Sequence, residues 1–335
     1  MNTTEKLQTE SAIQFVKSTF SGALEKKLNL TYVSAPMIVQ EHTGINDDLN
    51  GVEQPVSFPL RALSPYRAVV VHSLAKWKRM RLKEYGIEAG KGIWTDMRAL
   101  RPDEELSPLH SVYVDQWDWE KHITEPERTV TYLQDTVEQI YEALKETERQ
   151  TALRYPFVTP VLPDQIHFIH AETLLQQYPG LTAKEREAAI ARKYGAVFIM
   201  GIGGTLSNGE AHDGRAADYD DWSTPTESGL PGLNGDIILW HPVLECAFEV
   251  SSMGIRVNPL ALVRQLKEKD CTERSTLLYH KQLLSGQLPQ SMGGGIGQSR
   301  ICMFMLRKKH IGEVQVSIWP EAMRTALREE GVYLL

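Results

Sequence analysis

Apolar residues recur every three or four positions in two long segments of the chain, which is the spacing of an amphipathic helix. In residues 11–28 these residues are Ile13, Val16, Phe20, Leu24 and Leu28. In residues 127–149 they are Val130, Leu133, Val137, Ile140 and Leu144. A basic helix is expected over Ala75–Tyr85 and ends at Gly86, and a capping box at Thr182–Glu185 begins another helix that ends at Gly195.

Shorter segments have the patterns of β-strands. Strands are expected at Val69–Val71, Val197–Met200, Ile237–Trp240 and around Ala247–Val250. Ser111–Trp119 alternates polar and apolar residues, so Gln116 and Asp118 should share one face of a half-buried strand. Leu30–Val39 should also be extended, and Pro36 within it belongs at a sheet edge or interface. Because the helices are inserted irregularly between these strands, the pattern predicts an α+β fold with an antiparallel sheet flanked by helices.

Composition narrows the class of protein. The 335 residues contain no repeat, low-complexity tract or linker, so we expect a single domain over residues 1–335. A net charge of −7 argues against a general nucleic-acid binder, although a local basic cleft remains possible. Three widely spaced cysteines fit neither a disulfide framework nor a zinc site. With no signal peptide and no apolar run of membrane-spanning length, the sequence predicts a cytoplasmic protein with no membrane partner.

A glycine-rich stretch near the C-terminus, Ser291–Arg300, reads SMGGGIGQSR. The apolar segment after it predicts that the glycines open a helix, and exposed N–H groups at a helix N-terminus bind anions. Neither standard phosphate motif matches, because Gln298 stands where a dinucleotide fingerprint needs glycine and no Gly-Lys-Ser/Thr follows. A simple turn is an equally good interpretation of the glycines alone.

Charged residues in two further segments could bind a nucleotide. Arg101 should leave the end of a strand, where its planar guanidinium suits a phosphate. Asp236 before one strand and Glu249 in the next could present two carboxylates to Mg²⁺, which accepts one or two carboxylates together with phosphate oxygens. For each segment the alternative is a solvated surface.

Three other segments are ambiguous by themselves. The acidic loop Arg215–Trp222 and the basic residues of His72–Arg79 would by default be solvated, although the two aromatic residues of the acidic loop suggest that it faces a ligand. Asn46–Gly51 has the composition of turns. His167 and His170 should point to opposite faces of a strand, which makes them a poor metal pair.

These segments together resemble the three motifs of class II aminoacyl-tRNA synthetases, in the right order. The first motif, which builds the dimer interface of that class, matches Leu30, Val33, Pro36, Met37 and Ile38 after a long helix. The second matches Arg101, Glu104, His110, Val114 and Asp118. The third matches Gly293, Gly295, Gly297 and Arg300. From about residue 11 to residue 320 the chain is similar to the ammonia-dependent asparagine synthetase family, with segments such as ALRPDE, DYDDWSTP and FEVSSMGIRV.

The resemblance implies a class II synthetase-like catalytic domain that makes L-asparagine from L-aspartate, ammonia and ATP through a β-aspartyl adenylate, with Mg²⁺ as cofactor. Its implied catalytic residues are Asp47, Arg101 and Arg300, although Asp48 is an alternative to Asp47. Aspartate would be bound by Ser73, Lys78, Gln116, Asp118, Asp220, Ser252 and Arg256. ATP would be bound by Arg101, Glu104, His110, Ser111, Val112, Tyr219, Gly293, Gly295, Gly297 and Arg300. Asp236 and Glu249 would be the metal carboxylates, and the helix and strand at about 11–39 would form a homodimer interface.

Two alternatives remain. One is a tRNA-charging relative, but such enzymes for aspartate and asparagine carry an N-terminal anticodon-binding barrel, for which a catalytic-type helix beginning by about residue 11 leaves no room. The other is a non-catalytic nucleotide- or amino-acid-binding regulatory module. The joint presence of Arg101, Arg300, Asp236 and Glu249 argues against that module.

Overall fold

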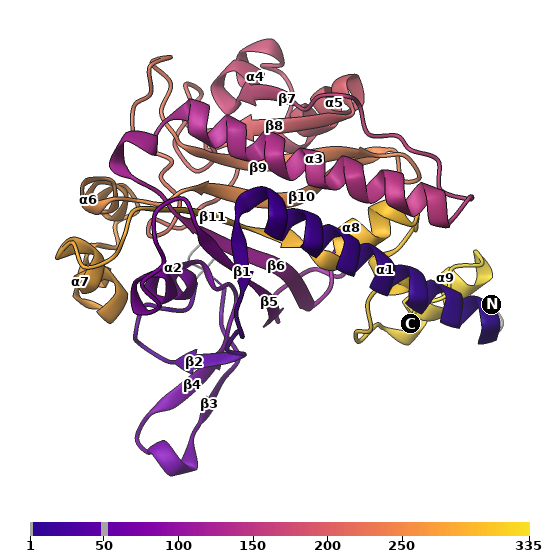
Figure 1. Cartoon of the computed structure of the whole chain (residues 1–335), viewed down its shortest axis with the longest axis horizontal. Coiled ribbons are helices and arrows are strands. Elements are labelled where there is room, and N and C mark those ends of the chain that lie inside the picture. The colour runs from indigo at the N-terminus through magenta and orange to yellow at the C-terminus, as the bar shows by residue number, and fades with distance from the viewer. Residues whose placement is uncertain (1–2, 48–52) are drawn as a thin grey trace.

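A computed structural model describes residues 3–47 and 53–335 of the chain, and within them a large sheet of eight strands runs through the molecule (Figure 1). The strands pair antiparallel across the middle, and the outermost pair at each edge is parallel. The predicted antiparallel sheet flanked by helices is therefore confirmed. In spatial order the strands are β1 (Leu30–Tyr32), β5 (Gly92–Leu100), β6 (Tyr113–His122), β11 (Ser291–Gly297), β10 (Cys246–Ile255), β9 (Asn234–His241), β8 (Ala196–Met200) and β7 (His167–His170).

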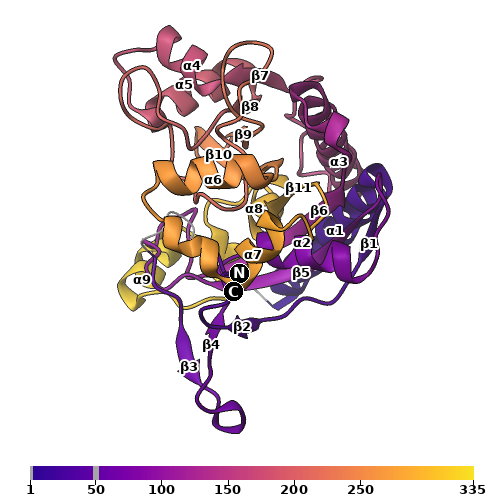
Figure 2. The same ribbon diagram turned by 90° about the vertical axis from the view of Figure 1, so that its left-hand side faces the viewer.

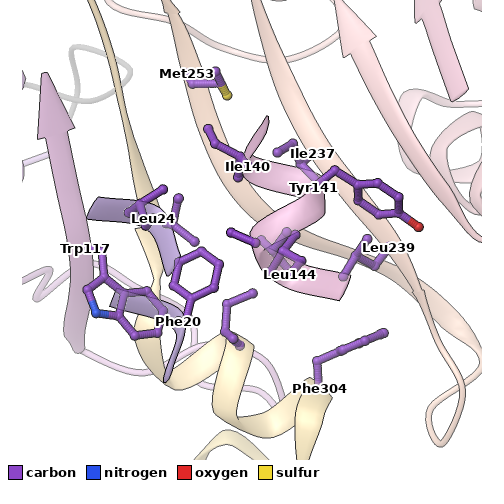
Figure 3. Packing of buried hydrophobic residues seen from close by; sticks show 14 of the residues in the cluster. Phe20, Leu24, Trp117, Ile140, Tyr141, Leu144, Ile237, Leu239, Met253 and Phe304 are labelled. Atoms are coloured by element: carbon purple, nitrogen blue, oxygen red, sulfur yellow. The ribbon is translucent and has the colours of Figure 1, made fainter. Parts of the chain in front are cut away.

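Three helices cover one face of this sheet and build the main core. They are α1 (Thr3–Leu28), α3 (Val130–Arg154) and α8 (Gln298–Met305), and α1 and α3 lie side by side along the sheet (Figures 1 and 2). The apolar stripes predicted for the two long helices all point into this core. Figure 3 shows the contact between helices and sheet through Phe20, Leu24, Trp117, Ile140, Tyr141, Leu144, Ile237, Leu239, Met253 and Phe304.

The other helices lie on the opposite face or at the ends of the sheet. The α5 helix (Ala183–Tyr194) packs against β8, β9 and β10 from the side opposite α3 (Figure 2). Its capping box is present as predicted, because the Thr182 side chain accepts from the Glu185 N–H. No helix within residues 3–47 and 53–335 has the length and apolar character of a transmembrane span. The remaining helices are α2 (Ala75–Glu84), α4 (Ala171–Gln177), α5 (Ala183–Tyr194), α6 (Pro259–Glu268), α7 (Leu278–Leu284) and α9 (Glu321–Glu329), with short 3₁₀ helices at Arg61–Leu63, Glu125–Glu127, Thr272–Thr276 and Ile311–Glu313.

The expected single extended segment Leu30–Val39 is two strands in two different sheets. Its first part is β1 in the large sheet, and its last part enters β2 (Ile38–Gln40) of a small sheet ordered β2-β4-β3. That sheet, completed by β4 (Arg67–Val70) and β3 (Ser57–Pro59), projects below the body in Figure 1. Pro36 lies in the connection, where a residue without an N–H costs no ladder hydrogen bond.

The alternation of side chains along the central strands assigns one face to the core and the other to polar residues. Trp117 and Trp119 of β6 belong to the core, so Gln116, Asp118 and Glu120 emerge on the other face. On β11, Met292 and Ile296 belong to the core in the same way. Gly293, Gly295 and Gly297 therefore lie on the polar face, beside β6 and β10.

Candidate active site

A cleft of about 440 Å³ opens on the polar face of the central strands. Its walls come from the small-sheet connection, the β5–β6 hairpin, the acidic loop before β9, β10 and the start of α8. Most of the residues singled out in the sequence line it: Asp47, Ser73, Arg101, Glu104, His110, Ser111, Gln116, Asp118, Tyr219, Asp220, Glu249, Ser252, Arg256, Gly295, Gly297 and Arg300. The other four, Lys78, Val112, Gly293 and Asp236, lie directly behind that lining.

Arg256 is fixed at one end of the cleft by two buried carboxylates. Its Nε and Nη2 donate to Glu120 over 2.8–3.1 Å, and its Nη1 donates to Asp220. Although burial opposes the ionised form, the Arg256 guanidinium keeps the pKa of Glu120 below its usual value. The guanidinium is thus held charged and oriented at the cleft wall.

Lys78 lies one layer deeper, and the basic helix that carries it is not a solvated face. The Lys78 ammonium donates to Asp118, to the Trp119 carbonyl at 2.8 Å and to the Gly294 carbonyl at 3.3 Å. On the same helix, Lys76 and Arg79 are also buried. The default expectation that these basic residues are solvated was wrong. The sheet supplies buried carboxylates and carbonyls as their partners, and the sequence does not show those partners.

The acidic loop is likewise buried and anchored. Asp218 accepts from Lys76 at 3.0 Å, from Arg274 at 2.8 Å and from the His280 ring at 2.9 Å. Tyr219, next in the chain, lines the cleft, and burial raises its pKa well above the ordinary value. The loop therefore presents Tyr219 and its neighbours on a rigid base.

The glycines of SMGGGIGQSR form strand β11, and the last of them, Gly297, is the N-cap of α8. The expected helix therefore follows the glycines directly, but the run itself is a strand. Their function here is to leave space. A Cβ at Gly293 would collide with the Glu120 carboxylate and with Arg256, and one at Gly295 would collide with the Gln116 amide. Side chains of β6, together with Arg256 just after β10, occupy the room above the bare backbone, which periodicity could not reveal.

The opposite end of the cleft, near the start of β10, is rich in cations. Arg101 directly follows β5, as expected, and its N–H donates to the Val112 carbonyl at 2.8 Å. Arg300, in the first turn of α8, donates to the Glu249 carbonyl at 2.8 Å. Burial, with the positive charge of Arg300, lowers the pKa of His110 to about 4, so this imidazole is neutral at pH 7. Two guanidiniums and a neutral imidazole suit an anionic ligand.

Asp236 and Glu249 lie near one another on the same face of β9 and β10. Glu249 is opposite Ile238, two residues beyond Asp236, so the carboxylates are diagonal neighbours beside a bulge in β10. Burial and the charge of Glu249 raise the pKa of Asp236 to about 7, although Arg215 pairs with it.

These two carboxylates fit a metal ion that arrives with its ligand better than a resident one. In the part of the chain that the structure describes, no three His, Cys, Asp or Glu side chains gather into a metal cage. Two carboxylates beside a phosphate-binding end are nevertheless the donor set that Mg²⁺ uses with nucleotides. The residues therefore fit Mg²⁺ bound jointly with phosphate oxygens.

Asp47 is buried at the cleft beside Ser73, whose hydroxyl donates to its carboxylate at 2.8 Å. His72 holds the same turn, with its N–H on Asn46 Oδ1 at 2.9 Å and its ring on the Asp47 carbonyl at 3.1 Å. The turn is therefore built to present one carboxylate. The alternative candidate, Asp48, lies outside the described residues.

Sequence reasoning missed Glu120, Arg215 and Lys184. Glu120 holds Arg256, and the alternation that linked Gln116 with Asp118 extends to it. Arg215 pairs with Asp236 and lines the cleft, as does Lys184 at the start of α5. The sequence offers no signal for Lys184, because the distance from α5 to the cleft is set only by the fold.

Comparison with known proteins adds to this geometry. A family model described as aspartate–ammonia ligase matches residues 7–331. An aspartate–ammonia ligase from Parabacteroides distasonis is 57% identical over 328 residues, which are 98% of this chain and 95% of that protein. One from Bacteroides thetaiotaomicron is 55% identical with the same coverage. Among solved structures, asparaginyl-tRNA synthetase from Pyrococcus horikoshii complexed with asparaginyl-adenylate has a TM-score of 0.66 at 15% identity, over 93% of this chain and 70% of that one; this likeness concerns the fold alone.

Proposed function

The chain belongs to the aspartate–ammonia ligase family, and from that premise we propose that it converts L-aspartate, ammonia and ATP to L-asparagine, AMP and pyrophosphate. One observation carries the proposal: a single cleft joins a buried, carboxylate-held Arg256 at one end to Arg101 and Arg300 at the other. The first end suits an amino acid and the second a nucleotide.

The reaction needs an activated carboxyl group. A carboxylate does not exchange oxygen for nitrogen by itself, because oxide is too poor a leaving group. Transfer of AMP to the β-carboxylate of aspartate releases pyrophosphate and makes AMP the leaving group. Attack of ammonia on the acyl carbon then gives asparagine and AMP, with one proton to be removed.

Aspartate would bind between β6, β10 and the acidic loop. Arg256 lines the cleft whereas Lys78 is covered, which favours Arg256 as the direct partner of a substrate carboxylate and Lys78 as the charge that orients Asp118. Asp118 and Asp220 are the candidate acceptors for the α-ammonium. The remaining proposed contacts are Ser73, Gln116 and Ser252, all of which line the cleft.

ATP would bind across the glycine strand. Arg101 is proposed to hold the α-phosphate, where charge develops during adenylate formation, and Arg300 the terminal phosphate. Glu104, His110, Ser111, Val112 and Tyr219 would surround the nucleotide, with Gly293, Gly295 and Gly297 beneath it. Asp236 and Glu249 would hold Mg²⁺, which when bound neutralises phosphate charge.

Asp47 is proposed to handle the nitrogen donor. Ammonia arrives mostly as ammonium, which has no lone pair for attack. A buried carboxylate beside Ser73 can hold that cation and accept a proton.

Assembly and location complete the proposal. We treat residues 1–335 as one catalytic domain that forms a homodimer through α1 and the segment around β1 and β2, with no nucleic-acid partner. The exposed apolar side chains of Tyr32, Met37 and Ile38 support such an interface. The three cysteines are unpaired in the structure, which agrees with a reducing cytoplasm.

The deciding experiment measures AMP formation from ATP, aspartate and ammonium, with and without tRNA. We expect asparagine and AMP in equal amounts, independent of tRNA and dependent on ammonium. Formation of AMP only with tRNA would indicate the charging alternative. Nucleotide binding without any AMP would indicate the regulatory module.

A further inference from the structure

Three cations at the cation-rich end of the cleft are paired with carboxylates. Arg215 donates through Nη2 to Asp236, and Arg300 lies 3.9 Å from a carboxylate oxygen of Glu249. Lys184 lies 3.1 Å from Glu187 and 3.4 Å from Asp213. Three cations at the end proposed for the triphosphate are therefore already paired, and two of their carboxylate partners, Asp236 and Glu249, are those proposed for the metal ion.

Arg215 stands between Asp236 and the cleft. Its side chain lines the cleft and is 11% exposed, whereas Asp236 is behind it and 4% exposed. Among the residues that the structure describes, the buried Nε of Arg215 has no hydrogen-bond partner. The side chain is thus partly open to the cleft and keeps this donor unused, so a small turn of the guanidinium would let it bind a further oxyanion.

Separating this pair is unfavourable unless both partners find new ones. A metal ion alone could take Asp236 only by leaving a buried guanidinium without its carboxylate, and breaking a buried pair in that way is strongly destabilising. A phosphate group that arrives with the ion supplies the missing partner. Phosphate and guanidinium match well, because the planar fork donates two parallel hydrogen bonds.

We propose that Arg215 is a further phosphate-binding residue that exchanges partners: it pairs with Asp236 in the free protein and with the leaving phosphates when ATP and Mg²⁺ bind together. The inference rests on the proposed function and adds a residue to it. Its consequence is that divalent ion and nucleotide bind synergistically, while the ion alone is excluded by the guanidinium.

The test measures binding of Mn²⁺, as a spectroscopic substitute for Mg²⁺, by electron paramagnetic resonance with and without a non-hydrolysable ATP analogue. We expect wild-type protein to bind Mn²⁺ weakly alone and about tenfold or more tightly with the analogue. R215Q should bind Mn²⁺ alone about tenfold more tightly than wild type and lose most of the synergy. Equal Mn²⁺ binding by wild type and R215Q, with and without the analogue, would overturn the proposal.

The matched control is R307Q. Arg307 pairs with Glu148 at 2.6 Å, and the two side chains are 13% and 3% exposed, close to the values for Arg215 and Asp236. Because this pair is outside the cleft, R307Q should bind Mn²⁺ as wild type does. If R307Q instead binds Mn²⁺ as tightly as R215Q, the tighter binding comes from a general structural change, and the proposal is overturned.

R215K decides the matter if R215Q does not fold. Lysine keeps a positive charge beside Asp236 but lacks the planar guanidinium that donates two parallel hydrogen bonds to a phosphate. Mn²⁺ alone should therefore stay weakly bound, while affinity for the ATP analogue falls about tenfold. Unchanged analogue affinity would contradict the inference. Failure of the proposed function would be seen separately, as absence of ammonium-dependent AMP formation by the wild-type protein.

Discussion

Gly293 of β11 lies directly against the carboxylate of Glu120 on β6, with no room for a side chain between them. A Cβ at 293 would collide with Oε2 of Glu120 and would also lie 2.6 Å from Nη2 of Arg256. The glycine thus makes space for the Glu120–Arg256 pair. Gly293 does not have a positive φ, so its backbone conformation would not by itself require glycine.

Replacing Gly293 with alanine should therefore impair aspartate binding. The added methyl group must displace Glu120 or Arg256, and overpacking of this kind costs about 1–3 kcal/mol. We expect a raised KM for aspartate and a lowered melting temperature. Gly180→Ala is the control, because nothing lies within 4 Å of the added Cβ. Unchanged aspartate kinetics in Gly293→Ala would show that the pair tolerates displacement.

Alanine at Arg101 or Arg300 should abolish adenylate formation while the fold persists. The Arg101 contact to Val112 uses its backbone N–H and survives the change. Loss of one donor to a developing charge typically costs roughly 10²–10³-fold in rate. The measurement is aspartate-dependent ATP–pyrophosphate exchange, with Arg98→Ala, an exposed arginine on β5, as control. Near-native exchange in Arg101→Ala or Arg300→Ala would refute the phosphate assignment.

Asp47→Asn should separate the two half-reactions. The asparagine keeps an acceptor for the Ser73 hydroxyl but loses the charge and the base, which typically costs roughly 10²–10⁴-fold. We expect ATP–pyrophosphate exchange to persist, amide formation to fall and the KM for ammonium to rise. Asp103→Asn, on the same cleft, is the control. If exchange and synthesis fall together, Asp47 acts instead in substrate binding or loop shape.

The protein should sediment as a dimer at micromolar concentration. Met37 is 61% exposed in the single chain and lies beside the exposed Ile38. Met37→Asp should place a charge in the proposed interface and shift the protein toward monomer. Leu260→Asp changes a 78% exposed apolar residue on α6 and should leave the sedimentation unaltered. A wild-type monomer would remove the basis for this interface.

His241 should make the protein less stable in acid. Burial, with the nearby Arg307, lowers its pKa from 6.5 to about 4, and its Nδ1 accepts from the N–H groups of Val243 and Leu244. Between those pH values the unfolded chain binds more protons than the folded one, so stability falls as pH falls from 6.5 toward 4. His241→Asn keeps an acceptor and cannot titrate there. Melting curves should show a smaller acid-induced loss in that variant; an equal loss would exclude His241 as a cause.

Local sequence determined much of the fold, because hydrophobic periodicity and capping are properties of neighbouring residues. The stripes Phe20–Leu24 and Ile140–Leu144, the capping box at Thr182 and the alternation of β6 all exist as predicted. The order of three motifs also identified the family, since their spacing follows from the order of the same elements. The division of Leu30–Val39 into two strands near Pro36 could not be predicted from the sequence, because it depends on pairing with two separate sheets.

Tertiary structure alone decided which charges are buried and what they meet. Lys78 and Asp218 looked like surface residues because a sequence gives no partner for a charge; the sheet and the acidic loop supply those partners across the chain. Likewise, no neighbouring residue in the sequence explains why β11 needs glycines. The reason is that side chains from elsewhere in the fold occupy the space above them. Arg215 is the clearest case: its pairing with Asp236 joins a loop to a strand, and such a contact is set by packing rather than by any spacing along the chain.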